Sequence, residues 1–354
     1  MDESAAVAGT ISNGESVAAA IVRTLMDFAV AKGADRDALV RRSGLDPAWL
    51  DDPDGRIPYA HYKALMRAGK SLSGDPALAL HFGEAFDMVD LSILGALGVA
   101  CETVADAFAL LGRFTRLVID VALQEGADGQ RMMLKRVGGA LWLVDMRRDP
   151  SEFPELTESS FARMAAASRR FGGYAFIKAV HVTHEAPAYR DEYDRIFGVP
   201  VTFASDRNAL LMTDDSWMNL KSPQPSRYAL EVLRERAEAL LEDLDSAKTM
   251  RGRVEKLLVP VLHTGEAGMA AVAAKLGMSR PTLFRKLKAE GVTFEAVRDA
   301  LRRRLAQDCL ETRRLSVGET AYLLGFSEPA AFSRAFRRWT GRSPRAARAS
   351  AEPR

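Results

Sequence analysis

The sequence predicts an α+β domain followed by an all-α domain that carries two helix-turn-helix units. Three observations lead to this prediction. The spacing of apolar residues alternates between helical and strand periods up to residue 221. A motif at Ala271–Gly291 recurs, with changes, at Ala321–Gly341. The two parts of the chain also differ in charge.

The charge of the chain is divided unevenly. Its 354 residues hold 49 Lys and Arg against 47 Asp and Glu, a net charge of +2. From Ser246 onward the balance is 22 basic against 10 acidic residues, whereas the remainder has 27 against 37. A basic part joined to an acidic part indicates a nucleic-acid-binding module attached to another domain.

Cysteine usage and hydropathy indicate the compartment. Cys101 and Cys309 are the only cysteines, which favours a reducing environment over a disulfide framework. The amino terminus lacks a signal pattern, and no apolar run reaches the roughly 18 residues of a membrane span. We therefore expect a cytoplasmic protein without a membrane segment.

The first elements are short helices. Residues 1–14 are expected to be a flexible tail. A helix is predicted from Ser16 to Gly33, because apolar residues recur on one face, namely Val17, Ile21, Leu25 and Phe28. At Asp46-Pro47 and Asp75-Pro76, an aspartate N-cap precedes a proline that suits the first helical position.

Strands are predicted in the second half of this domain. Thr103 and Asp106, three residues apart, open one more helix, after which the period changes. We expect a hairpin between Val118–Gln124 and Met132–Val137 and a third strand at Leu141–Met146. The remaining predicted elements are a helix near 155–171, a strand at 177–182, a helix around 189–197, and short strands at 201–203 and 209–212.

A linker helix is predicted at residues 222–247, after an α+β domain that spans 15–221. Its proline-rich start is followed by apolar residues at alternating spacings of three and four, namely Leu230, Leu233, Ala237, Leu240 and Leu244. Two interpretations remain open. The helix packs on its own domain, or it forms a short seam between the two copies of a homodimer.

The first helix-turn-helix unit is predicted at about 269–290, inside an all-α domain at 248–348. Gly277 supplies the turn, Ser279 caps the second helix, and Leu283 and Leu287 face the core. The side chains left to contact DNA are Arg280, Thr282, Phe284, Arg285, Lys286 and Lys288.

The second unit is predicted at about 317–340. A capping box of Ser316 and Glu319 opens it, Gly325 supplies the turn, and Phe332 and Phe336 anchor the second helix. The side chains left to contact DNA are Ala330, Ser333, Arg334, Arg337 and Arg338. Residues 349–354 are expected to be a tail.

The chemistry of these side chains suits a duplex. Arginine can bond guanine through two hydrogen bonds, and an exposed phenylalanine such as Phe284 can touch a thymine methyl group. Arg280 and Lys288 are better placed for phosphates. A helix at Phe294–Leu310 is expected to hold the two units so that they enter successive major grooves, about 34 Å apart.

The segment from about Gly265 to Arg348 resembles the DNA-binding domain of the AraC/XylS family of bacterial transcriptional regulators. Its most characteristic stretch is LLGFSEPAAFSRAFRRWTGRSPRAAR. The resemblance implies seven helices, base contacts from Arg285 and Arg334, and RNA polymerase as a partner. The chain departs from the family at Ala346-Ala347, where a bulky, often aromatic residue is usual in the second slot before Arg348.

The amino-terminal part resembles the "arabinose-binding-like" sensor domain of one branch of this family. The stretches that carry the resemblance are GRIPYAHYKALM, SGDPALALHFGEAF and FGVPVTFASDRNALLM. This type of sensor has no fixed ligand across the family, so the resemblance implies an effector without naming it.

Candidate effector residues each have a structural alternative. Arg113 and Arg116 could clamp a carboxylate or pair with acids such as Asp120. Aromatic residues could line a pocket or pack in the core, namely Tyr59, Trp142, Tyr193 and Trp217. His184 is a further candidate, but His181 and His184 lack a third zinc ligand, so no metal site is expected.

The sequence therefore predicts a ligand-responsive transcriptional regulator, more an activator than a repressor. Its expected partners are double-stranded promoter DNA, a small-molecule effector, RNA polymerase and a second copy of the chain. No cofactor is expected. Two alternatives remain, an enzyme-like domain that turns over its ligand and a DNA-binding protein that needs no ligand.

Overall fold

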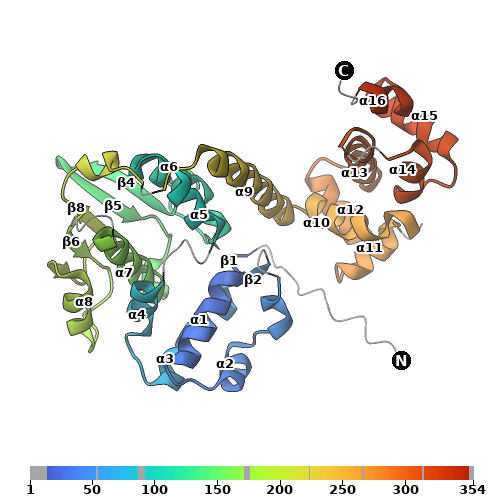
Figure 1. Cartoon of the computed structure of the whole chain (residues 1–354). Coiled ribbons are helices and arrows are strands. Elements are labelled where there is room, and N and C mark those ends of the chain that lie inside the picture. Colours follow the sequence, from blue (N-terminus) through green and yellow to red (C-terminus); the bar gives the residue numbers. More distant parts are fainter. Residues whose placement is uncertain are drawn as a thin grey trace. The chain divides into compact units, whose positions relative to one another are not determined.

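The computed structural model describes residues 14–52, 55–86, 92–170, 176–222, 224–264, 267–312 and 315–350 (Figure 1). The chain forms two compact units, and the division between Leu241 and Glu242 falls inside helix α9 (Arg227–Lys248). Of the two predicted tails, residues 1–13 and 351–354 lie outside the described residues.

The amino-terminal unit begins with a small antiparallel sheet that the sequence did not reveal. Its strand order is β2 (Arg56–Pro58), β1 (Ser16–Ala18) and β3 (Ile119–Asp120). Val17 lies opposite both Ile57 and Ile119. The prediction of a helix from Ser16 is therefore wrong for its first three residues, because they are extended and paired before helix α1 begins.

Helices pack around this small sheet and beyond it. In chain order they are α1 (Ala19–Ala31), α2 (Arg36–Ser43), α3 (Tyr59–Ser73), α4 (Leu78–Ala85), α5 (Ile93–Ala100), α6 (Val104–Phe114), α7 (Pro154–Arg170) and α8 (Arg190–Phe197). Thr103 and Asp106 open α6 as predicted, and they form a capping box there. Asp46 caps a short 3-10 helix as predicted, whereas α4 starts two residues later than Asp75-Pro76 indicated.

The main sheet has five strands, in the order β4 (Met132–Val137), β5 (Ala140–Asp145), β8 (Ala209–Met212), β6 (Ile177–His181) and β7 (Val201–Thr202). All neighbours are antiparallel except β6 and β7. The predicted hairpin between Val118–Gln124 and Met132–Val137 is wrong. Strand β4 pairs instead with β5, across Gly138-Gly139, whose φ angles of 58° and 81° suit a tight hairpin turn.

One face of this sheet is covered by helices α6, α7 and α8. Side chains that alternate along the strands, such as Leu141, Leu143 and Leu210, join a core with Phe161 and Tyr193 from the helices. Successive strand residues point to opposite faces, so the other face carries the residues between them. The fold is the predicted combination of helices with a mainly antiparallel sheet.

Helix α9 packs on its own unit as far as Leu241. Its apolar side chains Leu230, Leu233, Ala237 and Leu241 contact a cluster from α5 and α6 that includes Phe114. This packing agrees with the first of the two interpretations, in which the linker helix packs on its own domain. The opposite side of the helix remains exposed, with Tyr228 80% and Val232 49% accessible.

The carboxyl-terminal unit contains the seven α-helices that the family resemblance implied, within the described residues. They are α10 (Met250–Leu258), α11 (Met269–Lys275), α12 (Arg280–Ala289), α13 (Phe294–Gln307), α14 (Val317–Leu323), α15 (Pro329–Thr340) and α16 (Pro344–Ser350). A 3-10 helix, η5 (Val259–Thr264), follows α10, and a π-helical turn, η6 (Asp308–Thr312), follows α13.

Two hydrophobic clusters organise this unit. The first gathers apolar side chains of α10, α11, α12 and the start of α13, and the second gathers those of α14, α15 and α16. Helix α13 serves both, because Phe294 and Leu301 lie in the first, Ala306 lies in the second, and Leu305 packs against each. Ala346 is exposed, whereas Ala347 is fully buried, so α16 docks without the family's bulky residue.

Candidate nucleic-acid interface and effector cavity

The first helix-turn-helix unit consists of α11 and α12. Gly277 makes the turn with a φ angle of 65°, and the Ser279 side chain accepts a hydrogen bond from the backbone nitrogen of Thr282. Leu283 and Leu287 are almost fully buried, as predicted. At the end of α12, Glu290 accepts hydrogen bonds from the first backbone nitrogens of α10 and so ties the two helices together.

The outward side of α12 is basic. Arg280, Arg285, Lys286 and Lys288 are exposed, Thr282 is half-buried, and the Phe284 ring is 52% accessible. No described residue forms an ion pair or hydrogen bond with the Arg285 side chain. The side chains predicted to contact DNA are therefore available on one helix, with an apolar ring among them.

The second unit consists of α14 and α15. The capping box of Ser316 and Glu319 is present, and Gly325 makes the turn with a φ angle of 71°. Phe332 and Phe336 are fully buried. Unlike the turn of the first unit, this turn is packed tightly, because a Cβ atom on Gly325 would lie 1.8 Å from the carbonyl oxygen of Leu262 in η5.

Helix α15 also has a basic outward side. Ala330, Arg334, Arg337 and Arg338 are exposed and Ser333 is half-buried. Arg338 forms an ion pair with Asp299 of α13 at 3.2 Å, whereas no described residue pairs with Arg334. Exposed ion pairs of this kind contribute little to stability. Arg338 can therefore release the carboxylate of Asp299 and bind a DNA phosphate instead.

Arg302 is a positioning residue that the sequence did not distinguish from its neighbours Arg303 and Arg304. Its Nε atom donates to the carbonyl oxygen of Leu324 at 3.0 Å, and its guanidinium lies 4.8 Å from the centroid of the Phe326 ring. Arg302 thereby fixes the turn of the second unit to α13. The Arg-Arg-Arg run alone gave no signal of this role.

A cavity of about 280 Å³ lies in the amino-terminal unit, between helices α5 and α6, the covered face of the main sheet and α7. Its wall is mostly apolar and includes Leu94, Val104, Phe108, Met164, Phe176 and Trp217. Its size is near the lower end of pockets that hold small-molecule ligands. Of the aromatic residues considered from the sequence, Trp217 lines this cavity.

None of the five predicted effector residues lines this cavity. Arg116 forms an ion pair with Asp120 at 3.2 Å, and Arg113 with Glu238 of α9 at 3.3 Å. Both arginines thus pair with acidic side chains of the protein. This is the structural alternative to clamping the carboxylate of a ligand.

The aromatic and histidine candidates also lie elsewhere. Trp142 lies between Leu141 and Leu143 on β5, so it points to the other face of the sheet, where its ring contacts His181. Tyr59 is buried at the start of α3, beside a separate cavity of only about 40 Å³. His184 shares a hydrogen bond of 2.9 Å with the hydroxyl group of Tyr193.

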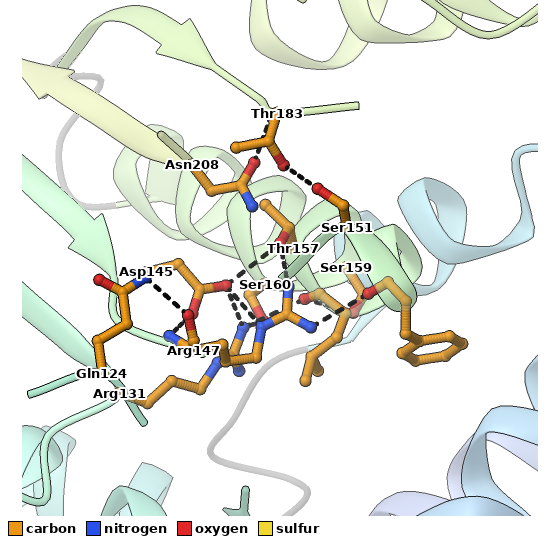
Figure 2. A network of polar contacts seen from close by, with 12 residues as sticks. Gln124, Arg131, Asp145, Arg147, Ser151, Thr157, Ser159, Ser160, Thr183 and Asn208 are labelled. Atoms are coloured by element: carbon orange, nitrogen blue, oxygen red, sulfur yellow. Dashed lines mark hydrogen bonds and ion pairs between the residues drawn. The ribbon is translucent and has the colours of Figure 1, made fainter. Parts of the chain in front are cut away.

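Figure 2 shows a buried polar network. It adjoins the large cavity through Arg131 and Ser160, which line that cavity. Asp145 at the end of β5 is inaccessible to solvent and accepts hydrogen bonds from Arg131 at 3.3 Å and from Arg147 at 2.9 Å. Thr157 of α7 donates to the same carboxylate at 3.2 Å. Burial alone would raise the pKa of Asp145, but the two guanidinium groups outweigh it and hold the pKa below its ordinary value.

Two further observations bear on the class of protein. Within the described residues, no group of three or more His, Cys, Asp and Glu side chains is arranged to hold a metal ion. In the same part of the chain, no helix combines the length and apolar character that crossing a membrane requires.

Comparison with known proteins agrees with this architecture. Residues 33–221 match the model of the arabinose-binding domain of AraC transcription regulators, and residues 272–350 match a helix-turn-helix domain. The ornithine utilization regulator of Pseudomonas aeruginosa is 27% identical over 93% of this chain and 95% of its own length. The regulator VirS of Mycobacterium tuberculosis is 35% identical over 36% of each chain.

Among solved structures, the transcriptional regulator CdpR from Pseudomonas aeruginosa matches 88% of this chain and 96% of its own, with 21% identity and a TM-score of 0.41. That likeness is too distant to support a conclusion about function.

The fold and its two basic helical hairpins define a DNA-binding transcriptional regulator with a separate cavity-bearing domain. The chain belongs to the AraC family of transcriptional regulators, with an arabinose-binding-like domain before the helix-turn-helix domain. The resemblance read from the sequence is confirmed. The protein is accordingly a regulator and not an enzyme.

Proposed function

We propose that this regulator is a ligand-responsive activator. Its carboxyl-terminal unit binds a specific promoter element through α12 and α15. Its amino-terminal unit binds a small-molecule effector in the 280 Å³ cavity, and the bound protein contacts RNA polymerase. The observation that carries the proposal is the pair of exposed basic helices, each held by a glycine turn and a buried apolar face.

Within these helices, Arg285 and Arg334 are proposed to contact bases. Both side chains are exposed, lie at corresponding places in the two units and have no described partner. Arg280, Lys286, Lys288, Arg337 and Arg338 are proposed to contact phosphates, with Thr282, Phe284, Ala330 and Ser333 beside the bases.

Replacing Arg285 or Arg334 by alanine is expected to weaken binding to the preferred DNA by about 1–3 kcal/mol, because each arginine provides a bidentate contact to one base. Discrimination at that base pair should relax as well. The preferred sites are first selected by the full-length protein from random duplexes, and affinities are then measured at one salt concentration. A reporter gene placed after a selected site should lose expression with either variant if the protein activates transcription.

Arg227→Ala serves as the matched control, because it removes an equal charge from an exposed position on α9. Its affinity should stay close to that of the wild type. Unchanged affinity of the Arg285 and Arg334 variants for selected and random duplexes alike would show that the contact assignment is wrong.

We also propose that the protein acts as a homodimer that uses the exposed side of α9. Tyr228 and Val232 lie one turn apart there, and they are 80% and 49% accessible. Burial of such apolar side chains favours association. Sedimentation of the full-length protein should give the mass of a dimer, and Val232→Glu should shift it toward the monomer. A wild-type monomer at tens of micromolar concentration would refute the proposal.

A further inference from the structure

We propose that the large cavity takes a small apolar monoanion, such as a medium-chain or aryl carboxylate, with its carboxylate beside Arg131 and its hydrocarbon part against α5 and α6. This inference rests on the proposed effector function of the cavity and names the chemistry of the effector. It follows from the lining of the cavity and from a charge imbalance behind its wall.

The lining accepts hydrocarbon. Helices α5 and α6 contribute aliphatic side chains and glycines, and an aromatic cluster closes another part of the wall. In that cluster, the centroid of the Trp217 ring lies 4.9 Å from that of Phe108 and 5.4 Å from that of Phe176. Removing a hydrocarbon chain from water against such surfaces is favourable by roughly 25 cal/mol per Å².

The lining also argues against a cationic effector. Among the described residues that line the cavity, there is neither an aspartate nor a glutamate. An ammonium group that enters an apolar site without a carboxylate loses its hydration without compensation. A diamino acid, which carries two ammonium groups, therefore does not fit this cavity, although a relative of the chain is named for ornithine utilization.

The charged side chains of the described wall are arginines. Arg131 and Arg163 both line the cavity. Behind the wall, Arg131 and Arg147 share the single carboxylate of Asp145, so this buried trio has a net charge of +1 (Figure 2). A buried charge of this kind is costly unless an opposite charge compensates it.

Helix α7 carries two carboxylates that could compensate this charge, but both have other partners. Glu155 forms an ion pair with Lys70 at 3.1 Å. Glu158 accepts hydrogen bonds from the hydroxyl groups of Tyr189 and Tyr193, and burial raises its pKa. A ligand carboxylate would therefore meet a positive wall whose compensation is incomplete.

Arg131 is a cationic side chain held at the wall of the cavity. Its Nη2 atom donates to Asp145, to the carbonyl oxygen of Leu156 and to Ser160. Its Nε atom is buried and has no hydrogen-bond partner within the described residues. Arg131 is only 7% accessible, so the network holds the guanidinium in one place. A ligand carboxylate at this wall would compensate the charge of the guanidinium group through a charge-assisted contact.

The test compares probes of matched shape on the full-length protein by calorimetry and thermal shift. Octanoate, 1-octanol, octylamine and L-ornithine are the probes. Octanoate should bind at least tenfold more tightly than 1-octanol or octylamine and should raise the melting temperature, whereas L-ornithine should not bind. Equal binding of octanoate and 1-octanol, tighter binding of either amine, or no binding of octanoate would overturn the inference.

Three variants locate the binding. Ala107→Phe fills the cavity from α6 and should abolish binding of every probe. Arg131→Gln should reduce octanoate to the affinity of 1-octanol. If that variant does not fold, Arg163→Met takes its place, with an expected tenfold loss for octanoate and no change for 1-octanol. Octanoate binding that survives Ala107→Phe, or an arginine variant that weakens both probes equally, would contradict the proposal.

The Ala107→Phe variant also separates this inference from the sensor function on which it rests. If the cavity is the effector site, this variant should bind promoter DNA but lose the condition-dependent response of the reporter, whichever probes bind in vitro. A variant that keeps the wild-type response would refute the sensor function itself. A lost response together with no preference for octanoate would refute only the proposed anion.

Discussion

Replacing Gly325 by alanine is expected to destabilise the carboxyl-terminal unit by about 4 kcal/mol, at the upper end of single-residue effects. Two causes add. The φ angle of 71° lies in the left-handed region, which costs a residue with a Cβ atom about 1 kcal/mol. The new Cβ would also lie 1.8 Å from the Leu262 carbonyl oxygen, so the backbone of η5 or of the turn must move.

Gly277 offers a matched control within the same domain. It occupies the corresponding turn of the first unit with a φ angle of 65°, and no atom lies within 4 Å of the position that a Cβ would take. Gly277→Ala should therefore show only the conformational cost of about 1 kcal/mol. Calorimetry of the two full-length variants, with DNA binding as a second measurement, compares them directly. Equal melting temperatures would mean that the contact with Leu262 does not constrain the turn.

The second large effect is expected at Asp145. Asp145→Ala should destabilise the amino-terminal unit by about 3–5 kcal/mol, because it leaves the buried guanidinium groups of Arg131 and Arg147 without their shared carboxylate. Asp215→Ala is the control, since Asp215 pairs with Arg136 on the surface, where removing the pair should change stability by at most about 1 kcal/mol. Urea unfolding of both variants measures the difference, and a similar loss in each would refute the role given to the network.

The same network predicts a dependence on pH. The pKa of Asp145 is lower in the folded protein than its ordinary value of about 3.9. The carboxylate therefore contributes its full stabilisation above that ordinary value, and this stabilisation is lost as the pH falls through the folded pKa. The stability difference between the wild type and Asp145→Asn should stay constant from about pH 8 to pH 5 and shrink below about pH 4.

The helix-turn-helix units could be predicted from the sequence because their signals are local. A glycine at the turn, a capping serine and apolar residues four apart determine each hairpin within about twenty residues. The same signals placed Arg285 and Arg334 on the outward sides of α12 and α15. Turn and cap chemistry does not depend on the rest of the chain, so these elements agree with the structure.

The parts that the sequence did not reveal depend on distant residues. Strand β1 exists because Val17 pairs with Ile57 and Ile119, which lie far along the chain. The large cavity is a space between several elements, and no local pattern marks it. Arg131 and Asp145 form their network only when β4 and β5 lie beside α7, so neither residue stood out among the other charged residues.

Helix α13 has a consequence for how this domain can be altered. Because it contributes side chains to both hydrophobic clusters, and Leu305 to each of them, the cores of the two helical hairpins are joined through one helix. The pair should melt in one transition and exchange its amide hydrogens as one body. A chimera that takes one hairpin from another regulator must therefore bring a matching α13 with it, because this helix supplies part of the core of each hairpin.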